Sequence, residues 1–231
     1  MRANLPQMKN NSAYAAFSLV FSFLAFRFTG ALASGAGDSA AYILSWAVGL
    51  FSALVFLRRI PRQVTEAMIF ESSEDECEHV EVPHSHAADD TECASRRVLR
   101  NILIFIASLS ILLAANFVFA LIKGAGNPRA ISARVIFESA LLKPFCEEAL
   151  FRGAYPALCR RGEISPVLTT IACSAAFAAI HSGSSAIFAL FAGIVLSLAE
   201  ERSHLGSRGF LLTFAVHGTY NLTLCCLSAS L

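Results

Sequence analysis

Apolar residues run along this chain in long stretches separated by short polar segments. A bilayer core about 30 Å thick needs about 20 mostly apolar residues in each helix that crosses it. Three stretches meet this requirement well, and four less pure stretches follow them. The pattern therefore predicts an all-α fold, a polytopic transmembrane bundle of about seven helices, with a range of six to eight. The predicted helices cover residues 15–32, 41–57, 101–122, 133–158, 165–181, 185–200 and 209–231.

Composition supports lipid as the solvent of this chain. The 231 residues are 55% hydrophobic and 15% charged, whereas a soluble domain is usually about 45–50% apolar and about 25% charged. We expect an integral, multi-pass protein whose first partner is the lipid bilayer, in a bacterial inner membrane or an endomembrane. The formal net charge is +1, and no long basic run is present, so nucleic-acid binding is not expected.

Polar residues divide the chain into three parts. Residues 1–57 form two predicted N-terminal transmembrane helices, and residues 101–231 form the predicted transmembrane core. Between them lie residues 58–100, where the stretch from Glu71 to Glu92 alone holds nine of the chain's seventeen acidic residues, and this composition predicts a disordered loop. Arginines near span ends favour the cytoplasmic side, so the loop is expected there, while the orientation of the C-terminal helices stays open. The flanking arginines are Arg58, Arg59 and Arg62 on one side and Arg96, Arg97 and Arg100 on the other.

The predicted core carries ionisable residues inside apolar stretches. Glu147 and Glu148 are adjacent, His181 ends an apolar run, and His217 and Asn221 lie in the last one. An ionisable group at membrane depth costs roughly 2.5–3.5 kcal/mol even on the lenient insertion scale. Such groups normally face a protein interior or a water-filled cavity, and a functional role is the default hypothesis.

Helical spacing groups these residues on shared faces. Glu148 and Arg152 are four residues apart and can form an ion pair. His217 and Asn221 share the same spacing, and Phe177 lies one turn before His181, where it would pack beneath the imidazole. Three helices thus each carry a polar stripe that lipid cannot solvate. We expect the three stripes to meet in one cavity.

This set of side chains suits peptide hydrolysis, which needs a water, a base and donors for the oxyanion. Glu147 is the candidate base, and His181 can hold the same water. His217 and Asn221 can donate N–H groups to the developing oxyanion. Arg152 would hold the neighbouring carboxylate ionised and oriented.

The same residues also suit a metal ion. Histidine and carboxylate ligands with one open position describe a catalytic zinc site, and Glu147, His181 and His217 can supply three ligands. The sequence contains no H-E-x-x-H pair, so the ligands would have to come from separate helices. The residues leave two possibilities open for the cofactor, either none or one divalent metal such as zinc.

Each motif taken alone also has a structural explanation. The Glu148–Arg152 spacing is that of a common helix-stabilising pair, a single His181 at a helix end can be an interfacial residue, and His217 with Asn221 can be hydrogen-bonding groups between membrane helices. A proton-coupled transporter also uses Glu and His chains, but it predicts an internal repeat, and none is visible in the sequence. A catalytically inactive scaffold or immunity protein is the remaining alternative.

Together, in this order, the motifs E-E-x-x-x-R at 147–152, F-x-x-x-H at 177–181 and H-x-x-x-N at 217–221 resemble the CAAX protease and bacteriocin-processing family. Its members, also called Abi or type II CAAX prenyl endopeptidases, are intramembrane endopeptidases. The resemblance covers about 134–225. It implies a peptide or protein substrate at the membrane, which stays open between a prenylated protein, a bacteriocin leader and a membrane-protein segment.

The resemblance also implies roles for individual residues. Glu147 would be the catalytic base, Glu148 and His181 would complete the water site, and His217 with Asn221 would form the oxyanion pocket. Both a metalloprotease and a metal-independent glutamate mechanism are attributed to this family. A family helix with Phe and Gly between the two His motifs is matched loosely by Phe188, Phe191 and Gly193, while Ser197 replaces a second small residue, commonly Gly.

Overall fold

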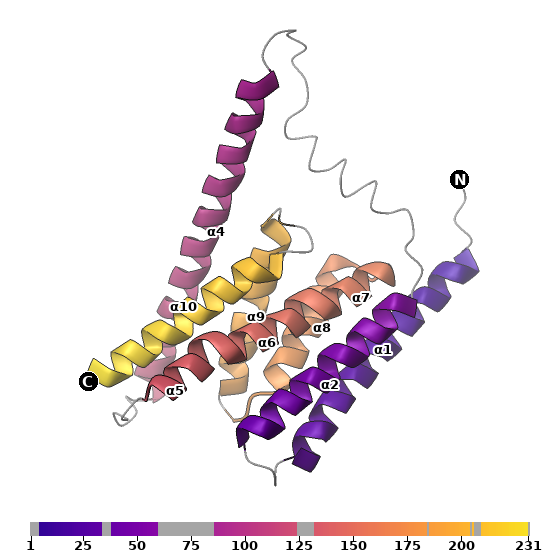
Figure 1. Cartoon of the computed structure of the whole chain (residues 1–231), viewed down its shortest axis with the longest axis horizontal. Coiled ribbons are helices and arrows are strands. Elements are labelled where there is room, and N and C mark those ends of the chain that lie inside the picture. Colours follow the sequence, from indigo (N-terminus) through magenta and orange to yellow (C-terminus); the bar gives the residue numbers. More distant parts are fainter. Residues whose placement is uncertain are drawn as a thin grey trace.

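The computed structural model describes residues 5–33, 38–59, 86–123, 132–183, 185–203, 205 and 209–230. Within these residues all regular structure is helical, which confirms the predicted fold class (Figure 1). One continuous helical run, from 133 to 161, contains several elements, so the described part of the chain has seven helical segments. The first three are α1 (Leu5–Ala33), α2 (Asp38–Arg59) and α4 (His86–Lys123). The run comprises α5 (Ala133–Phe137), η3 (Glu138–Leu142), α6 (Lys143–Glu148), η4 (Ala149–Ala154) and α7 (Tyr155–Arg161), and the last three are α8 (Pro166–Ala179), α9 (Ser185–Arg202) and α10 (Gly209–Ser230).

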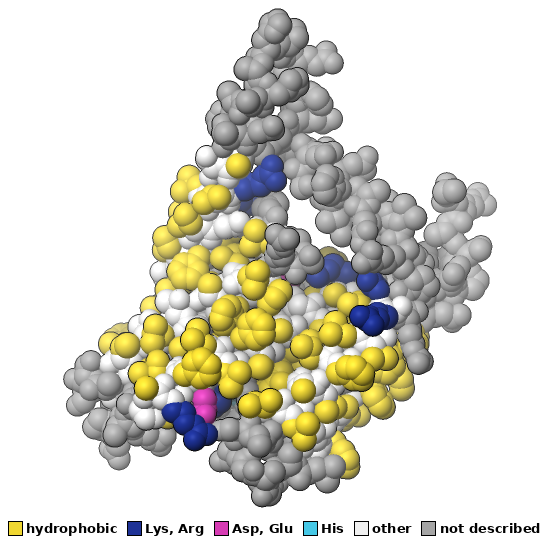
Figure 2. All heavy atoms as spheres, in the orientation of Figure 1, with side chains coloured by type: hydrophobic (Ala, Val, Ile, Leu, Met, Phe, Trp, Pro, Cys, Tyr) yellow, Lys and Arg dark blue, Asp and Glu magenta, His cyan; other side chains and the backbone are white. Residues whose placement is uncertain are grey.

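The exterior of the described helices matches a lipid solvent. Three helices contain windows long and apolar enough to cross a bilayer, Ser12–Thr29, Ala94–Ile122 and Gly209–Ser228. Two shorter apolar helices accompany them, Ile43–Arg58 and Pro166–Ala179. Large apolar side chains are exposed over much of the surface, and Figure 2 shows them as a broad area with the coloured charged side chains near its margins. Exposed apolar area on this scale is rare in soluble monomers, and the chain is an integral membrane protein.

The run 133–161 lies at the centre of the bundle. It contacts α1, α2 and α8 on one side and α10 on the other (Figure 1). On the first side Trp46 of α2 packs against Phe26 and Phe151, with ring centroids 4.7 and 5.8 Å apart. A second group of buried apolar residues joins α4, α9 and α10, including Leu112, Leu196 and Val216. The candidate functional residues lie between these two apolar groups.

Arginines gather at one end of the bundle. The guanidinium of Arg161 donates to the carbonyl of Leu57, which joins the ends of α7 and α2. Arg160 forms a 3.4 Å ion pair with Glu200, which joins the ends of α7 and α9. Arg160 and Arg161 therefore lie at the same end of the bundle as Arg58.

The boundary between the predicted loop and the third span is earlier than predicted. Helix α4 begins at His86, fifteen residues before the predicted start at 101, so the last part of the segment 58–100 is helical. Hydropathy finds only the apolar part of a helix, whereas alanine and arginine, which are frequent from 87 to 100, have high helix propensity in water as well. The rest of the predicted loop, residues 60–85, lies outside the described residues.

Candidate active site

Two π-helical segments, η3 and η4, flank the short helix that carries both glutamates. π-Helical turns are rare and occur frequently at functional sites. Each segment ends two residues before a proline, Pro144 at the start of α6 and Pro156 at the start of α7. Proline has no N–H to donate to the carbonyl four residues earlier. The sequence therefore interrupts the regular hydrogen-bond ladder on both sides of Glu147 and Glu148.

Glu148 forms the buried ion pair with Arg152 that the spacing predicted. The two side chains are fully buried, with Arg152 Nε 3.4 Å from Glu148 Oε2. The guanidinium also donates to the carbonyl of Gly193, over 3.0 Å, and its carbon lies 4.6 Å from the centre of the Phe177 ring. A buried charge is tolerated where it is paired and hydrogen-bonded. Arg152 thereby balances the charge of Glu148 at the centre of the bundle.

His217 of α10 lies between the two glutamates. Its Nδ1 is 2.9 Å from Glu148 Oε1, and because an ionised carboxylate only accepts hydrogen bonds, Nδ1 is the donor. Its Nε2 is 3.8 Å from Glu147 Oε2. Glu147 is itself buried, with 7% of its surface exposed. The two carboxylates thus contact opposite edges of one imidazole.

His181 reaches the same region from the end of α8. Its Nδ1 donates to the carbonyl of Phe177, over 2.9 Å, which leaves Nε2 available for other chemistry. The Phe177 ring lies 4.9 Å from the His181 ring and 6.0 Å from the His217 ring. The predicted packing of Phe177 beneath His181 is confirmed. Both histidines contact one phenyl ring, so their separation cannot exceed the sum of these two distances.

Asn221 makes a contact that the sequence did not predict. Its amide donates to the carbonyl of Ser139 in η3, over 2.8 Å, and so joins α10 to the central run. An asparagine amide has two N–H donors. Asn221 lies one helical turn after His217 in α10.

The structure brings most of the predicted site together. His217 lies within 4 Å of both Glu147 and Glu148, and His181 is linked to His217 through Phe177. As placed, however, no three His, Cys, Asp or Glu side chains in the described residues form a group that could hold a metal ion. Glu147, His181 and His217 therefore do not form the three-ligand set that the metal hypothesis requires.

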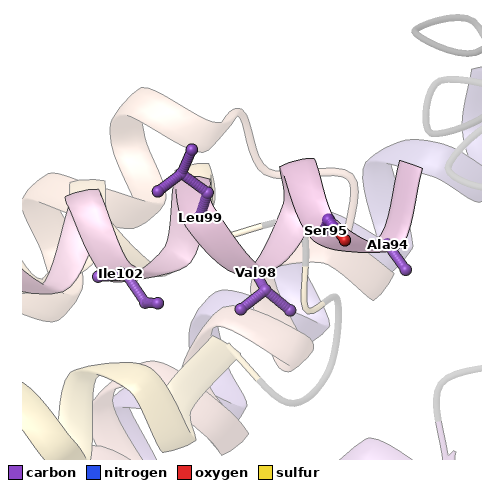
Figure 3. A pocket seen from close by; sticks show the side chains of 5 residues that line it. All are labelled: Ala94, Ser95, Val98, Leu99 and Ile102. Carbon is purple, nitrogen blue, oxygen red and sulfur yellow. The ribbon is translucent and has the colours of Figure 1, made fainter. Parts of the chain in front are cut away.

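A surface hollow elsewhere on the molecule is separate from these residues. Figure 3 shows that its lining comes from one helix, α4. It contains no charged side chain and none of the candidate residues. The lining residues are Ala94, Ser95, Val98, Leu99 and Ile102.

Sequence reasoning missed Gly218, which allows α10 to approach the central run. A Cβ added there would lie 2.5 Å from the carbonyl oxygen of Ala140. Pro144 cannot donate to that same carbonyl. In the sequence, this close approach is indicated only by the glycine next to His217 and by the proline four residues after Ala140.

Replacing Gly218 by alanine is expected to destabilise the fold by about 1–3 kcal/mol, as overpacking does. The backbone oxygen of Ala140 cannot rotate away, so α10 must shift, and the gain in helix propensity of about 1 kcal/mol is smaller. Thermal unfolding of the purified protein in detergent measures the effect. Gly153→Ala is the matched control, because its added Cβ would be 3.8 Å from the nearest atom. Equal midpoints for the two variants would contradict the predicted close approach.

Comparison with known families finds a match to one part of the chain. Residues 129–223 match the model of the family described as type II CAAX prenyl endopeptidase Rce1-like. No significant match to the chain was found among curated proteins or among solved structures. The matched segment contains every candidate site residue and supports protease activity at a membrane. Over residues 129–223 the chain is therefore similar to the Rce1-like type II CAAX prenyl endopeptidases.

Proposed function

We propose that this protein is an intramembrane endopeptidase that hydrolyses a peptide bond of a membrane-associated protein or peptide with a water activated by Glu147. The observation that supports it is the 3.8 Å separation of Glu147 Oε2 and His217 Nε2. This distance is too long for a hydrogen bond, and one water can bridge groups so placed. His181, whose ring also contacts Phe177, can orient the same water.

The reaction then needs one proton carrier. Glu147 takes a proton from the water, and the water oxygen attacks the carbonyl carbon of the peptide bond. When the tetrahedral intermediate collapses, the C–N bond breaks and Glu147 returns the proton to the leaving amine. No metal enters this scheme.

Glu148 has a different role from the water-site role implied by the family resemblance. Its carboxylate is fully buried between Arg152 and His217 Nδ1, so it orients the imidazole in the way an aspartate does in a catalytic triad. With Glu148 accepting at Nδ1 and Glu147 facing Nε2, His217 can carry both protons. Its Nε2–H and the second N–H of Asn221 then stabilise the oxyanion.

One observation favours a second candidate, an inactive scaffold or immunity protein with the same fold. The Asn221 amide already joins two helices through Ser139, which is a structural use of a residue assigned to the oxyanion pocket. A scaffold would retain this bond and would not need Glu147.

A comparison of membrane fractions distinguishes the two candidates. We expect a set of peptides, cut at discrete positions, to be produced with the parental protein and to disappear with Glu147→Ala, whereas a scaffold would leave the peptide set unchanged. Mass spectrometry of new termini is the measurement, and Arg160→Ala, altered at an exposed end of α7, is the control. The cleaved sequences would also show whether the substrate is a prenylated protein, a bacteriocin leader or another membrane protein, and in which membrane it lies. Identical termini in the parental and Glu147→Ala fractions would reject the protease.

A further inference from the structure

Arg152 connects four helical elements at the candidate site. It starts in η4, pairs with Glu148 in α6, covers the Phe177 ring of α8 and donates to the carbonyl of Gly193 in α9. Glu148 in turn accepts from His217 of α10. The position of the imidazole therefore depends on where the guanidinium is held.

Helix α9 contributes this support through a backbone atom. The Arg152 Nη2 to Gly193 O distance is 3.0 Å, and a carbonyl inside a helix moves only when the helix moves. The placement of α9 against α8 thus determines whether Arg152 retains its third contact.

The placement of α9 depends on the missing side chain of Gly193. A Cβ added there would lie 3.0 Å from Ser174 Cβ and 3.1 Å from Ser174 Cα in α8. Gly193 is the middle residue of three small buried ones spaced four apart, with Ala189 before it and Ser197 after it. Small residues at this spacing let membrane helices approach closely. Helices α8 and α9 therefore approach each other closely at the residue whose carbonyl holds Arg152.

We propose that Gly193 is a positioning residue for the active site. Its carbonyl holds Arg152, and Arg152 in turn holds the Glu148–His217 pair in place. The activity part of this inference rests on the proposed function, whereas the geometry of the pair does not. Gly193→Ala pushes α9 away from α8, lengthens the hydrogen bond from Arg152, and lets the guanidinium and Glu148 shift. His217 then loses its alignment with Glu147.

The expected result for Gly193→Ala is a fall in kcat of about 10–100-fold with KM within about threefold, since misplacement of a catalytic group by about 1 Å can cost 10²-fold. Ser174→Gly removes the Cβ that the new methyl would meet. The double variant Gly193→Ala/Ser174→Gly should therefore recover most of the lost turnover, a coupling expected only of residues in contact. Gly153→Ala is the control, being adjacent to Arg152 with room for its methyl.

A second measurement reports the pair without any substrate. The ¹⁵N spectrum of histidine-labelled protein in detergent distinguishes the protonation of Nδ1 and Nε2, and His217→Gln assigns the signal. We expect the His217 signal to change in Gly193→Ala and to return in the double variant. Ser174→Thr adds one methyl to the same contact from the α8 side and should change the His217 signal in the same direction. This variant replaces Gly193→Ala in the test if Gly193→Ala does not fold.

Each outcome decides between positioning and simple packing. The role of Gly193 would be established if turnover and the His217 signal both change in Gly193→Ala and both return in the double variant. Unchanged turnover in Gly193→Ala, or a loss of turnover with an unchanged His217 signal, would overturn it. If no variant cleaves any substrate but the signal still changes and returns, the positioning role stands and the proposed protease function fails.

Discussion

Glu147→Gln is expected to reduce proteolysis about 10²–10⁴-fold, the usual contribution of a general base. Glutamine keeps the shape of glutamate and most of its hydrogen bonds, but it cannot take a proton from water. The buried ion pair next to it, between Glu148 and Arg152, is untouched, so the fold should remain intact. Single-turnover cleavage of an identified substrate measures the chemical step, and thermal unfolding measures the fold.

Two results would reopen the assignment of the base. Parental turnover in purified Glu147→Gln would show that another group activates the water. The second result is strong inhibition of the parental protein by a chelator, with activity restored by added zinc. That result would mean that a metal site forms, although Glu147, His181 and His217 do not form a three-ligand set as placed. We expect the chelator to have no effect.

Arg152→Ala is expected to destabilise the protein by about 3–5 kcal/mol, the cost of leaving one partner of a buried pair uncompensated. Both side chains are completely buried, and the alanine also removes the donor to Gly193 and the cation above Phe177. Proteolysis should fall in the same variant, because Glu148 would no longer hold His217. Thermal unfolding and cleavage assays on one preparation test both effects.

Arg160→Ala is the matched control for this prediction. Arg160 also forms a 3.4 Å ion pair, with Glu200, but 45% of its side chain is exposed. An exposed pair contributes about 0–1 kcal/mol. Adding Glu148→Gln to Arg152→Ala should restore part of the lost stability, because no unpaired charge remains. Similar losses in Arg152→Ala and Arg160→Ala would mean that the central pair is not desolvated.

Local sequence was sufficient wherever the contact lies within one helix. Glu148 and Arg152 are four residues apart, as are Phe177 and His181, and helical geometry alone places each pair on one face. The apolar runs similarly determined the helical bundle, because the thickness of a bilayer sets the length of a spanning helix. Hydropathy could not locate the start of α4, since the helix continues past its apolar part.

Contacts between helices depended on the tertiary structure. His217 lies 69 residues from Glu148, Asn221 lies 82 residues from Ser139, and Arg152 lies 41 residues from Gly193. Periodicity predicted that polar stripes face inward, but it does not determine how each helix is rotated and shifted against its neighbours. The close approaches at Gly193 and Gly218 contribute to that register. The sequence by itself thus determined which residues can act and that they share a membrane interior, whereas side-chain and backbone packing decided that Glu148 orients His217 and Glu147 faces its free edge.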